Sequence, residues 1–337
     1  MNLLVGLIAW CALFASIGAA GTWLARRYAL QRQLLDHPGE RRSHRVATPR
    51  GGGIAIALAF LIAIIAMIVR QPGEIVLLAC AGFGLVLVAG IGWIDDHRPL
   101  SPWSRLWVHA VAASWLAAGF YLSGSSGMVA VVAFASVLAL VNIWNFMDGI
   151  DGLAASQTVL VAAVFAFAAG TSLAIHLGLA LAAATLAFLP FNVPRARIFL
   201  GDVGSGALGY ALALMLGLFL DVMPLAAWPL ALLPISACVL DAGLTLLTRM
   251  LRGERWWTPH VEHVYQRWAR SAGSHLPVTA LYAAWTLLAC AGVVWLSGKG
   301  QTGIVIAVMT WLAMGCGLWY WLRHRSFADE MDKETSA

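Results

Sequence analysis

The sequence has 337 residues, of which 61% are hydrophobic and 11% are charged. Soluble domains have roughly 45–50% apolar and 25% charged residues, so the composition excludes a water-soluble globule, a disordered chain and a collagen-like fibre. The formal net charge of +5 does not indicate nucleic-acid binding, because a basic rim beside a bilayer attracts lipid headgroups.

Eleven apolar runs are long enough to cross a bilayer as helices, since about 30 Å of hydrocarbon needs roughly 17–25 residues. The charges of the first run follow it, which favours a membrane anchor over a cleavable signal. Ser101 and Pro102 form an N-cap and first-turn proline that fix the start of the fourth run. The runs begin near Asn2, Gly51, Ile75, Pro102, Gly127, Gly152, Ser172, Gly206, Leu225, Pro277 and Gln301. The sequence therefore predicts an all-α, polytopic membrane helix bundle.

The basic residues predict the orientation of this bundle. Of the 21 Lys and Arg residues, 19 fall on one side of the predicted membrane, and only Arg70 and Lys299 fall on the other. Because basic residues accumulate on the cytoplasmic side, we expect the amino terminus outside and the carboxyl terminus in the cytoplasm. We expect one integral-membrane catalytic domain over residues 1–322 and a polar cytoplasmic tail over 323–337.

Polar residues cluster in four connections on the same predicted side, although the count of basic residues used none of them. The clusters are Asp95-Asp96, the block from Asn142 to Asp151, the block from Phe199 to Ser205, and His260 with His263. Adjacent carboxylates beside hydrocarbon are costly without a cation. Mg²⁺ is usually held by one or two carboxylates and the phosphates of its substrate, which suits scattered Asp and Asn residues. A solvated helix end is the alternative for the paired aspartates alone.

One block carries a polar residue at every third position, namely Asn142, Asn145, Asp148 and Asp151. If the preceding helix continues, these residues form one polar stripe at its end. The spacing favours ligand binding over a helix-stop signal made of Asn, Asp and Gly.

Two glycine-rich segments precede predicted helices, and each suits phosphate binding at a helix N-terminus. In the first, Ser43-His44 to Arg50 and the following three glycines combine cations with a glycine run. In the second, glycines flank Asp202. The alternatives are an ordinary basic loop on the cytoplasmic side for the first segment and close helix packing for the second.

An interfacial amphipathic helix is predicted over residues 259–272. Thr258 is its expected N-cap, Pro259 its first-turn proline and Gly273 its end. One face carries Val261, Val264, Tyr265 and Trp268, and the other carries His260, His263, Arg267 and Arg270. Imidazole and guanidinium groups suit an anionic, hydroxyl-rich ligand. The alternative is a surface helix with snorkelling arginines, which leaves the histidines without a role.

Asp241 lies within the ninth predicted span, about two turns from its cytoplasmic end. An ionisable group at this depth indicates either a functional role or pairing with a neighbouring helix, and both alternatives stay open.

Together and in this order, the motifs resemble the polyprenyl-phosphate N-acetylhexosamine-1-phosphate transferases, glycosyltransferase family 4, over nearly the whole chain. The resemblance rests on the His44 to Gly53 loop, Asp95-Asp96, Asn-x-x-Asn-x-x-Asp-Gly-x-Asp-Gly, Phe-x-Gly-Asp-x-Gly-Ser and the His260 to Arg267 block. The last block lacks the triple histidine of the muramoyl-pentapeptide translocases. The chain therefore looks nearer to the members that initiate O-antigen or related glycans.

The resemblance implies transfer of an N-acetylhexosamine 1-phosphate from a UDP-sugar to undecaprenyl phosphate, with release of UMP. It also implies Mg²⁺, with Mn²⁺ as an alternative, and a site facing the cytoplasm from the bacterial inner membrane. By position, Asn145 and Asp202 would contact the metal, Asp148 and Asp151 the nucleotide, Phe199 the uracil, Asp95 and Asp96 the lipid phosphate, and His260 and His263 the sugar or diphosphate. Catalytic roles are expected for Asp95, Asp96, Asp202, His260 and His263, and substrate binding for His44, Arg50, Asn142, Asn145, Asp148, Asp151, Phe199 and Arg267.

Two other functions compete with this expectation. A transporter would also have many spans, but it places its polar groups near the membrane midplane and often shows repeated halves. A membrane prenyltransferase also uses paired aspartates with Mg²⁺, but the spaced Asn residues and the histidine segment fit it poorly. Expected partners are the UDP-sugar, undecaprenyl phosphate and membrane lipid without nucleic acid, and a homodimer is an open alternative to a single chain.

Overall fold

The computed structural model describes residues 3–36, 46–255, 257–258 and 260–335, with side chains described up to residue 325. Within these ranges the chain is almost entirely helical, apart from one short antiparallel strand pair. The elements are α1 (Leu3–Gln31), β1 (Leu35–Asp36), β2 (Thr48–Pro49), α2 (Ile54–Arg70), η1 (Pro72–Glu74), α3 (Ile75–His97), α4 (Pro102–Leu122), α5 (Gly127–Met147), α6 (Leu153–Ala169), α7 (Ser172–Asn192), α8 (Gly201–Val222), η2 (Leu225–Ala231), α9 (Leu232–Leu251), α10 (Val264–Ala272), α11 (Leu276–Leu296) and α12 (Gln301–Thr335). The predicted all-α fold is confirmed.

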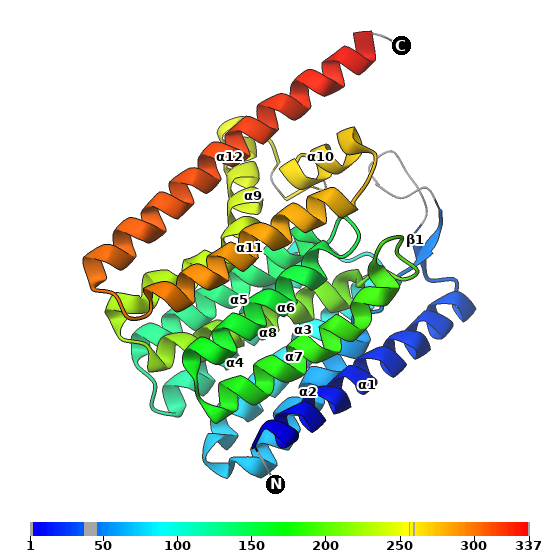
Figure 1. Ribbon diagram of the computed structural model, residues 1–337. Helices are drawn as coiled ribbons and strands as arrows, with labels where there is room; N and C mark the ends of the chain where they lie inside the picture. The colour runs from blue at the N-terminus through cyan, green and yellow to red at the C-terminus, as the bar shows by residue number, and fades with distance from the viewer. Residues whose placement is uncertain (1–2, 37–45, 256, 259, 336–337) are drawn as a thin grey trace.

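The long helices follow the predicted spans in order. Among the described residues, 8 candidate spans are long and apolar enough to cross a membrane, and α2 and α6 are shorter apolar helices. The remaining predicted span is α4, a helix of 21 residues that carries Arg105 and His109. Ser101 caps α4 as predicted, because its hydroxyl accepts the N–H of Ser104 at 3.1 Å. The chain is a multi-pass membrane protein, and its described ends lie at opposite ends of the bundle (Figure 1).

The helices α8 and α10 begin at other residues than predicted. The helix α8 begins at Gly201 rather than Gly206, because the Asp96 carboxylate accepts the otherwise unpaired N–H groups of its first turn. The helix α10 begins at Val264 rather than at 259. Thr258 is not its N-cap, since the Thr258 hydroxyl donates to the carbonyl of Arg255, and the predicted first-turn proline lies outside the described residues.

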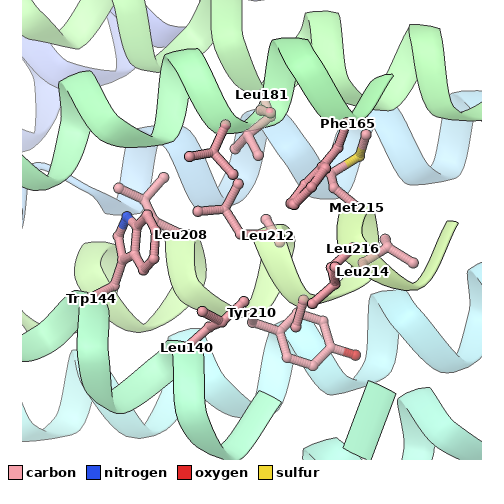
Figure 2. Packing of buried hydrophobic residues seen from close by; sticks show 14 of the residues in the cluster. Leu140, Trp144, Phe165, Leu181, Leu208, Tyr210, Leu212, Leu214, Met215 and Leu216 are labelled. Atoms are coloured by element: carbon pink, nitrogen blue, oxygen red, sulfur yellow. The ribbon is translucent and has the colours of Figure 1, made fainter. Parts of the chain in front are cut away.

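The centre of the bundle is α8, on which every residue from Val203 to Leu220 is buried. It contacts α2, α3, α5, α6 and α7, and Figure 1 shows it in the middle of the helices. Figure 2 shows its leucines packed with Leu140 and Trp144 of α5 and with Phe165 of α6. A helix that is apolar all round suits this enclosed position. The first turn of α8 is thereby held firmly at one end of the bundle.

The glycine run before α2 serves packing against the segment before α8. The N–H groups of Gly52 and Gly53 donate to the carbonyls of Phe199 and Leu200, each at 2.9 Å. A Cβ atom at Gly53 would lie only 2.1 Å from the Cα atom of Gly204. The prediction that these amides bind phosphate is therefore wrong for Gly52 and Gly53, because both N–H groups already have backbone partners.

Candidate active site

Two cavities meet at the end of the bundle where α3 and α5 end and α8 begins. A polar cavity of about 270 Å³ is lined by Asp36, Arg50, Asp96, Asn145, Asp148, Gly149, Ile150, Asp151, Asn192, Phe199, Gly201, Asp202, Ser205, Val261, Gln266 and Arg270. A larger, mostly apolar cavity of about 670 Å³ includes Asn142, Asn145, Asp148, Asp202, His260 and His263. Asn145, Asp148 and Asp202 line both cavities. Residues from all four predicted clusters therefore come together.

Asp202 and Asn145 form the contact between α8 and α5 at this junction. The Asn145 side-chain amide donates to Oδ1 of Asp202 and, at 3.2 Å, to the hydroxyl of Ser205. The Asp202 side chain keeps 26% of its surface exposed. One carboxylate and one amide oxygen are thus available to a ligand that lies between the cavities.

Asp96 supports Asp202 from behind. Its carboxylate accepts the N–H groups of Asp202 and Val203 at 3.0 and 3.1 Å, and its side chain is only 2% exposed. A carboxylate at a helix N-terminus satisfies orphan N–H groups and interacts favourably with the helix dipole. Arg50 donates to the backbone carbonyl of Asp96. Asp96 therefore fixes the direction in which α8 presents Asp202.

Asp95 has different partners from its neighbour and lines neither cavity. One of its oxygens lies 2.8 Å from Nη1 of Arg105, and the same nitrogen lies 3.6 Å from Oδ1 of Asp202. Sequence reasoning counted Arg105 only as a basic residue on the cytoplasmic side. A cation in the first turn of a helix opposes the helix dipole, and this signal could have indicated that Arg105 has carboxylate partners.

The predicted stripe of four polar residues is wrong as a continuous helix face. The helix α5 ends at Met147, Asp148 is its C-cap, and α6 follows from Gly152 in a left-handed conformation with φ 72°. Burial and the carboxylates of Asp202, Asp96 and Asp151 raise the pKa of Asp148 well above its usual range. Asp148 therefore takes up a proton more readily than an exposed aspartate does, first because it is buried and second because three other carboxylates lie near it.

Asp151 connects this turn with two other segments. Its Oδ1 lies 3.2 Å from Nδ1 of His275, and its Oδ2 accepts the N–H of Ala196 at 3.1 Å. The hydroxyl of Thr279 donates to the Asp151 carbonyl at 2.9 Å. His275 was missed because its sequence neighbourhood shows no motif, and only the fold brings it beside Asp151.

The histidine segment lies against the end of α5. The ring of His263 stacks on Phe146 with centroids 5.8 Å apart, and the His260 ring lies 4.9 Å from that of His263. The hydroxyl of Tyr265 donates to the carbonyl of Phe146 at 2.7 Å. These contacts place both imidazoles beside the residues common to the two cavities.

The other predicted binding residues have varied positions. Arg267 is 4% exposed and lines neither cavity, so the predicted exposed polar face of α10 is wrong at this residue because α10 packs against α12. Asn142 lines the apolar cavity and donates to the Leu138 carbonyl at 2.7 Å. Phe199 is half-buried at the edge of the polar cavity. His44 lies outside the described residues.

The donors around the junction fit a metal that is shared with a ligand. Among the described residues, no group of three or more His, Cys, Asp or Glu side chains forms a complete metal cage. Asp202, Asp148 and Asn145 nevertheless offer oxygen donors to both cavities. Mg²⁺ is commonly held by one or two carboxylates together with substrate phosphates. This donor set is of that kind.

Replacing His260 by glutamine is expected to reduce the acid sensitivity of the fold. Burial, His263 and Arg249 lower the pKa of His260 from 6.5 to about 4. Between these pH values His260 binds a proton in the unfolded chain but not in the folded one. Its contribution to the free energy of unfolding is therefore fully present above pH 6.5 and is lost as the pH falls toward 4. We expect the melting temperature in detergent to fall less between pH 7 and pH 5 in His260→Gln than in the wild type. The exposed His324→Gln should behave as the wild type does, and an equal fall in both variants would contradict the assignment.

Comparisons with known proteins point to one family. A model described as glycosyl transferase family 4 matches residues 76–219. The chain is 27% identical to a probable undecaprenyl-phosphate N-acetylglucosaminyl 1-phosphate transferase of Bacillus subtilis, over 77% of each chain. It is 29% identical to a decaprenyl-phosphate N-acetylglucosaminephosphotransferase of Mycobacterium leprae, over 84% of this chain and 80% of that one. It is also 30% identical to a phospho-N-acetylmuramoyl-pentapeptide-transferase of Heliobacterium modesticaldum, over 57% and 68%.

Proposed function

Because the chain belongs to glycosyl transferase family 4, we propose that it transfers an N-acetylhexosamine 1-phosphate from a UDP-sugar to undecaprenyl phosphate. One observation carries this proposal: Asn145, Asp148 and Asp202 line a polar cavity and an apolar cavity at once. Two substrates of opposite character, a nucleotide sugar and a lipid, can therefore meet at one set of oxygen donors. The family relatives named as phosphotransferases support the same class of reaction.

The polar cavity suits the nucleotide sugar. Arg50 and Arg270 provide positive charge for a diphosphate, and Phe199 provides an aromatic face for uracil. The apolar cavity suits the first part of a polyprenyl chain, because Trp103, Leu106, Leu138 and Leu246 line it. His260 and His263 lie in this second cavity, beside the donors common to both.

The proposed reaction is a phosphoryl transfer. An oxygen of the lipid phosphate bonds to the phosphorus that carries the sugar, the bond from that phosphorus to the bridging oxygen breaks, and UMP leaves with that oxygen. A phosphate monoester with a second pKa of about 6 is mostly dianionic at neutral pH and needs no strong general base. Placement and charge neutralisation therefore dominate the catalysis. Asn145 and Asp202 would hold Mg²⁺, which would offset the charge of the diphosphate.

The distribution of basic residues supports a site that faces the cytoplasm, where UDP-sugars are made. The predicted cytoplasmic side carries 19 of the 21 Lys and Arg residues, and the two cavities lie among those connections. We place the protein in the bacterial inner membrane, at the first step of a lipid-linked glycan such as O-antigen or another surface polysaccharide.

Purified protein incubated with UDP-GlcNAc, undecaprenyl phosphate and Mg²⁺ tests the proposal. We expect release of UMP together with a diphosphate-linked lipid sugar, and the same assay with other UDP-N-acetyl sugars identifies the donor. Failure to release UMP from any of these donors would reject the proposal. Pyrophosphate released from a prenyl diphosphate would instead support a prenyltransferase.

Replacing Phe199 by alanine is expected to weaken nucleotide binding. Aromatic stacking contributes about 0.5–1.5 kcal/mol beyond buried area, which corresponds to a rise in KM for the UDP-sugar of about two- to thirteenfold. The kcat value should change less, because contact with the uracil is made equally before and during the transfer, and loss of such uniform binding raises KM rather than lowering kcat. Phe199→Tyr keeps an aromatic ring and is the control. A KM in Phe199→Ala equal to that of Phe199→Tyr would contradict the stacking role.

A further inference from the structure

Asp241 is a buried carboxylate that belongs to neither cavity of the candidate active site. It lies on α9 and is 2% exposed. From its own helix, the hydroxyl of Thr245 donates to it at 3.3 Å. From two further helices, the hydroxyl of Tyr282 on α11 donates at 2.7 Å and the indole N–H of Trp319 on α12 at 3.3 Å. Asp241 thus joins three long helices.

The remaining donors come from the first turn of α10. The N–H of Val264 donates to Oδ1 of Asp241 at 2.9 Å, and the N–H of Tyr265 donates to Oδ2 at 3.1 Å. The N-cap residue of α10, His263, makes no side-chain capping hydrogen bond. Helix N-termini need acceptors for these N–H groups. Asp241 provides these acceptors, although it lies more than twenty positions earlier in the chain.

The same turn also borders the candidate active site, and Nδ1 of His263 lies 3.9 Å from Oδ1 of Asp241. His260, His263 and Gln266 line the apolar cavity, and Val261 and Gln266 line the polar one. Tyr265 connects the turn to α5 through its bond to the Phe146 carbonyl, one residue from the end of that helix. The segment therefore has one attachment beside Asn145 and another at Asp241.

From this geometry we infer that Asp241 is a positioning residue for the proposed transfer, because it holds the N-terminus of α10 and thereby sets His260 and His263 against the substrates. The expected effect of Asp241 on the rate rests on the proposed function. Its expected effect on the position of α10 rests only on the hydrogen bonds described above. A group displaced by about 1 Å can cost about 100-fold in rate. Of the residues proposed to bind the UDP-sugar, Arg50 and Phe199 lie outside α10, and Arg270 lies on it.

Asp241→Asn is the test, because asparagine keeps the size of the side chain but turns an NH₂ group toward N–H donors. We expect kcat to fall by about 10- to 100-fold, with a smaller rise of KM for the UDP-sugar, because Gln266 and Arg270 of the polar cavity lie on α10 whereas Arg50 and Phe199 do not. Hydrogen exchange measured by mass spectrometry should show faster exchange in peptides that cover residues 261–272 and unchanged exchange in α8. The matched control is Asp221→Asn, at the exposed far end of α8. It should leave kcat, KM and the exchange of residues 261–272 at their wild-type values.

Each outcome bears on the inference. Wild-type kcat together with wild-type exchange at α10 in Asp241→Asn would overturn it. If Asp241→Asn does not fold, Tyr282→Phe removes only one neutral donor, and we expect a smaller rise of exchange in residues 261–272 with a parallel, smaller fall of kcat. No change in Tyr282→Phe would then reject the inference. If the wild-type protein releases no UMP, the proposed function fails, whereas the exchange data still decide whether Asp241 holds α10.

Discussion

Asp202→Asn is expected to reduce UMP release by at least about 100-fold, in the range seen when a preorganised electrostatic contact to a reacting group is removed. Asp202 lines both cavities, as Asp148 does, and keeps about a quarter of its side-chain surface exposed to a ligand. Asparagine preserves the shape of the side chain and removes the negative charge that would hold Mg²⁺. The loss should therefore come from metal and phosphate placement rather than from the fold.

A magnesium titration of activity measures this effect. In Asp202→Asn the residual activity should need a higher Mg²⁺ concentration, while the melting temperature in detergent stays close to the wild-type value. Asp221→Asn makes the same chemical change at the other end of the same helix and should leave the titration unaltered. An unchanged Mg²⁺ dependence in Asp202→Asn would count against its role as a ligand.

Gly53→Ala is expected to be the most destabilising of the substitutions considered. Its Cβ would lie 2.1 Å from the Cα of Gly204 and 3.0 Å from the Leu200 carbonyl, so backbone atoms, which cannot rotate away, would have to move. Overpacking of a well-packed interior costs about 1–3 kcal/mol and occasionally more, and we expect the upper end here. Because Gly204 is two residues after Asp202, activity should fall as well.

Thermal unfolding in detergent and the UMP assay check this expectation together. Gly90→Ala is the matched control, because a Cβ atom at Gly90 on α3 meets nothing within 4 Å. The control should unfold at or above the wild-type temperature. A Gly53→Ala protein as stable as the Gly90→Ala protein would show that α2 and α8 can separate at this crossing without cost.

Features that depend on local pattern could be predicted from the sequence. Apolar length predicted the order of the membrane helices, and the Ser101-Pro102 pair predicted the start of α4 to the residue. The gathering of polar clusters at one end followed from the alternation of helices that span a fixed thickness. For this reason the clusters that contain Asn145, Asp148 and Asp202 could be expected at the same end of the bundle.

Features that depend on distant partners could not be predicted. The start of α10 is set by Asp241 and that of α8 by Asp96. The local caps Thr258 and Pro259 therefore gave the wrong start for α10, and the apolar run gave the wrong start for α8. Arg105 likewise lies beside Asp202, and Asp151 beside His275, only because the helices pack together. Sequence spacing along one helix carries no information on such contacts.

The central helix α8 is enclosed by other helices, which separate it from the surrounding lipid. The outer helices α1 and α12 are mostly exposed, since only 17% of the most apolar stretch of each is buried, whereas the corresponding stretch of α8 is 100% buried. A thinner or thicker bilayer acts first on the outer helices, through tilt and hydrophobic mismatch. We therefore expect the first turn of the central helix, which carries Asp202, to respond less to changes in acyl-chain length than α1 and α12 do.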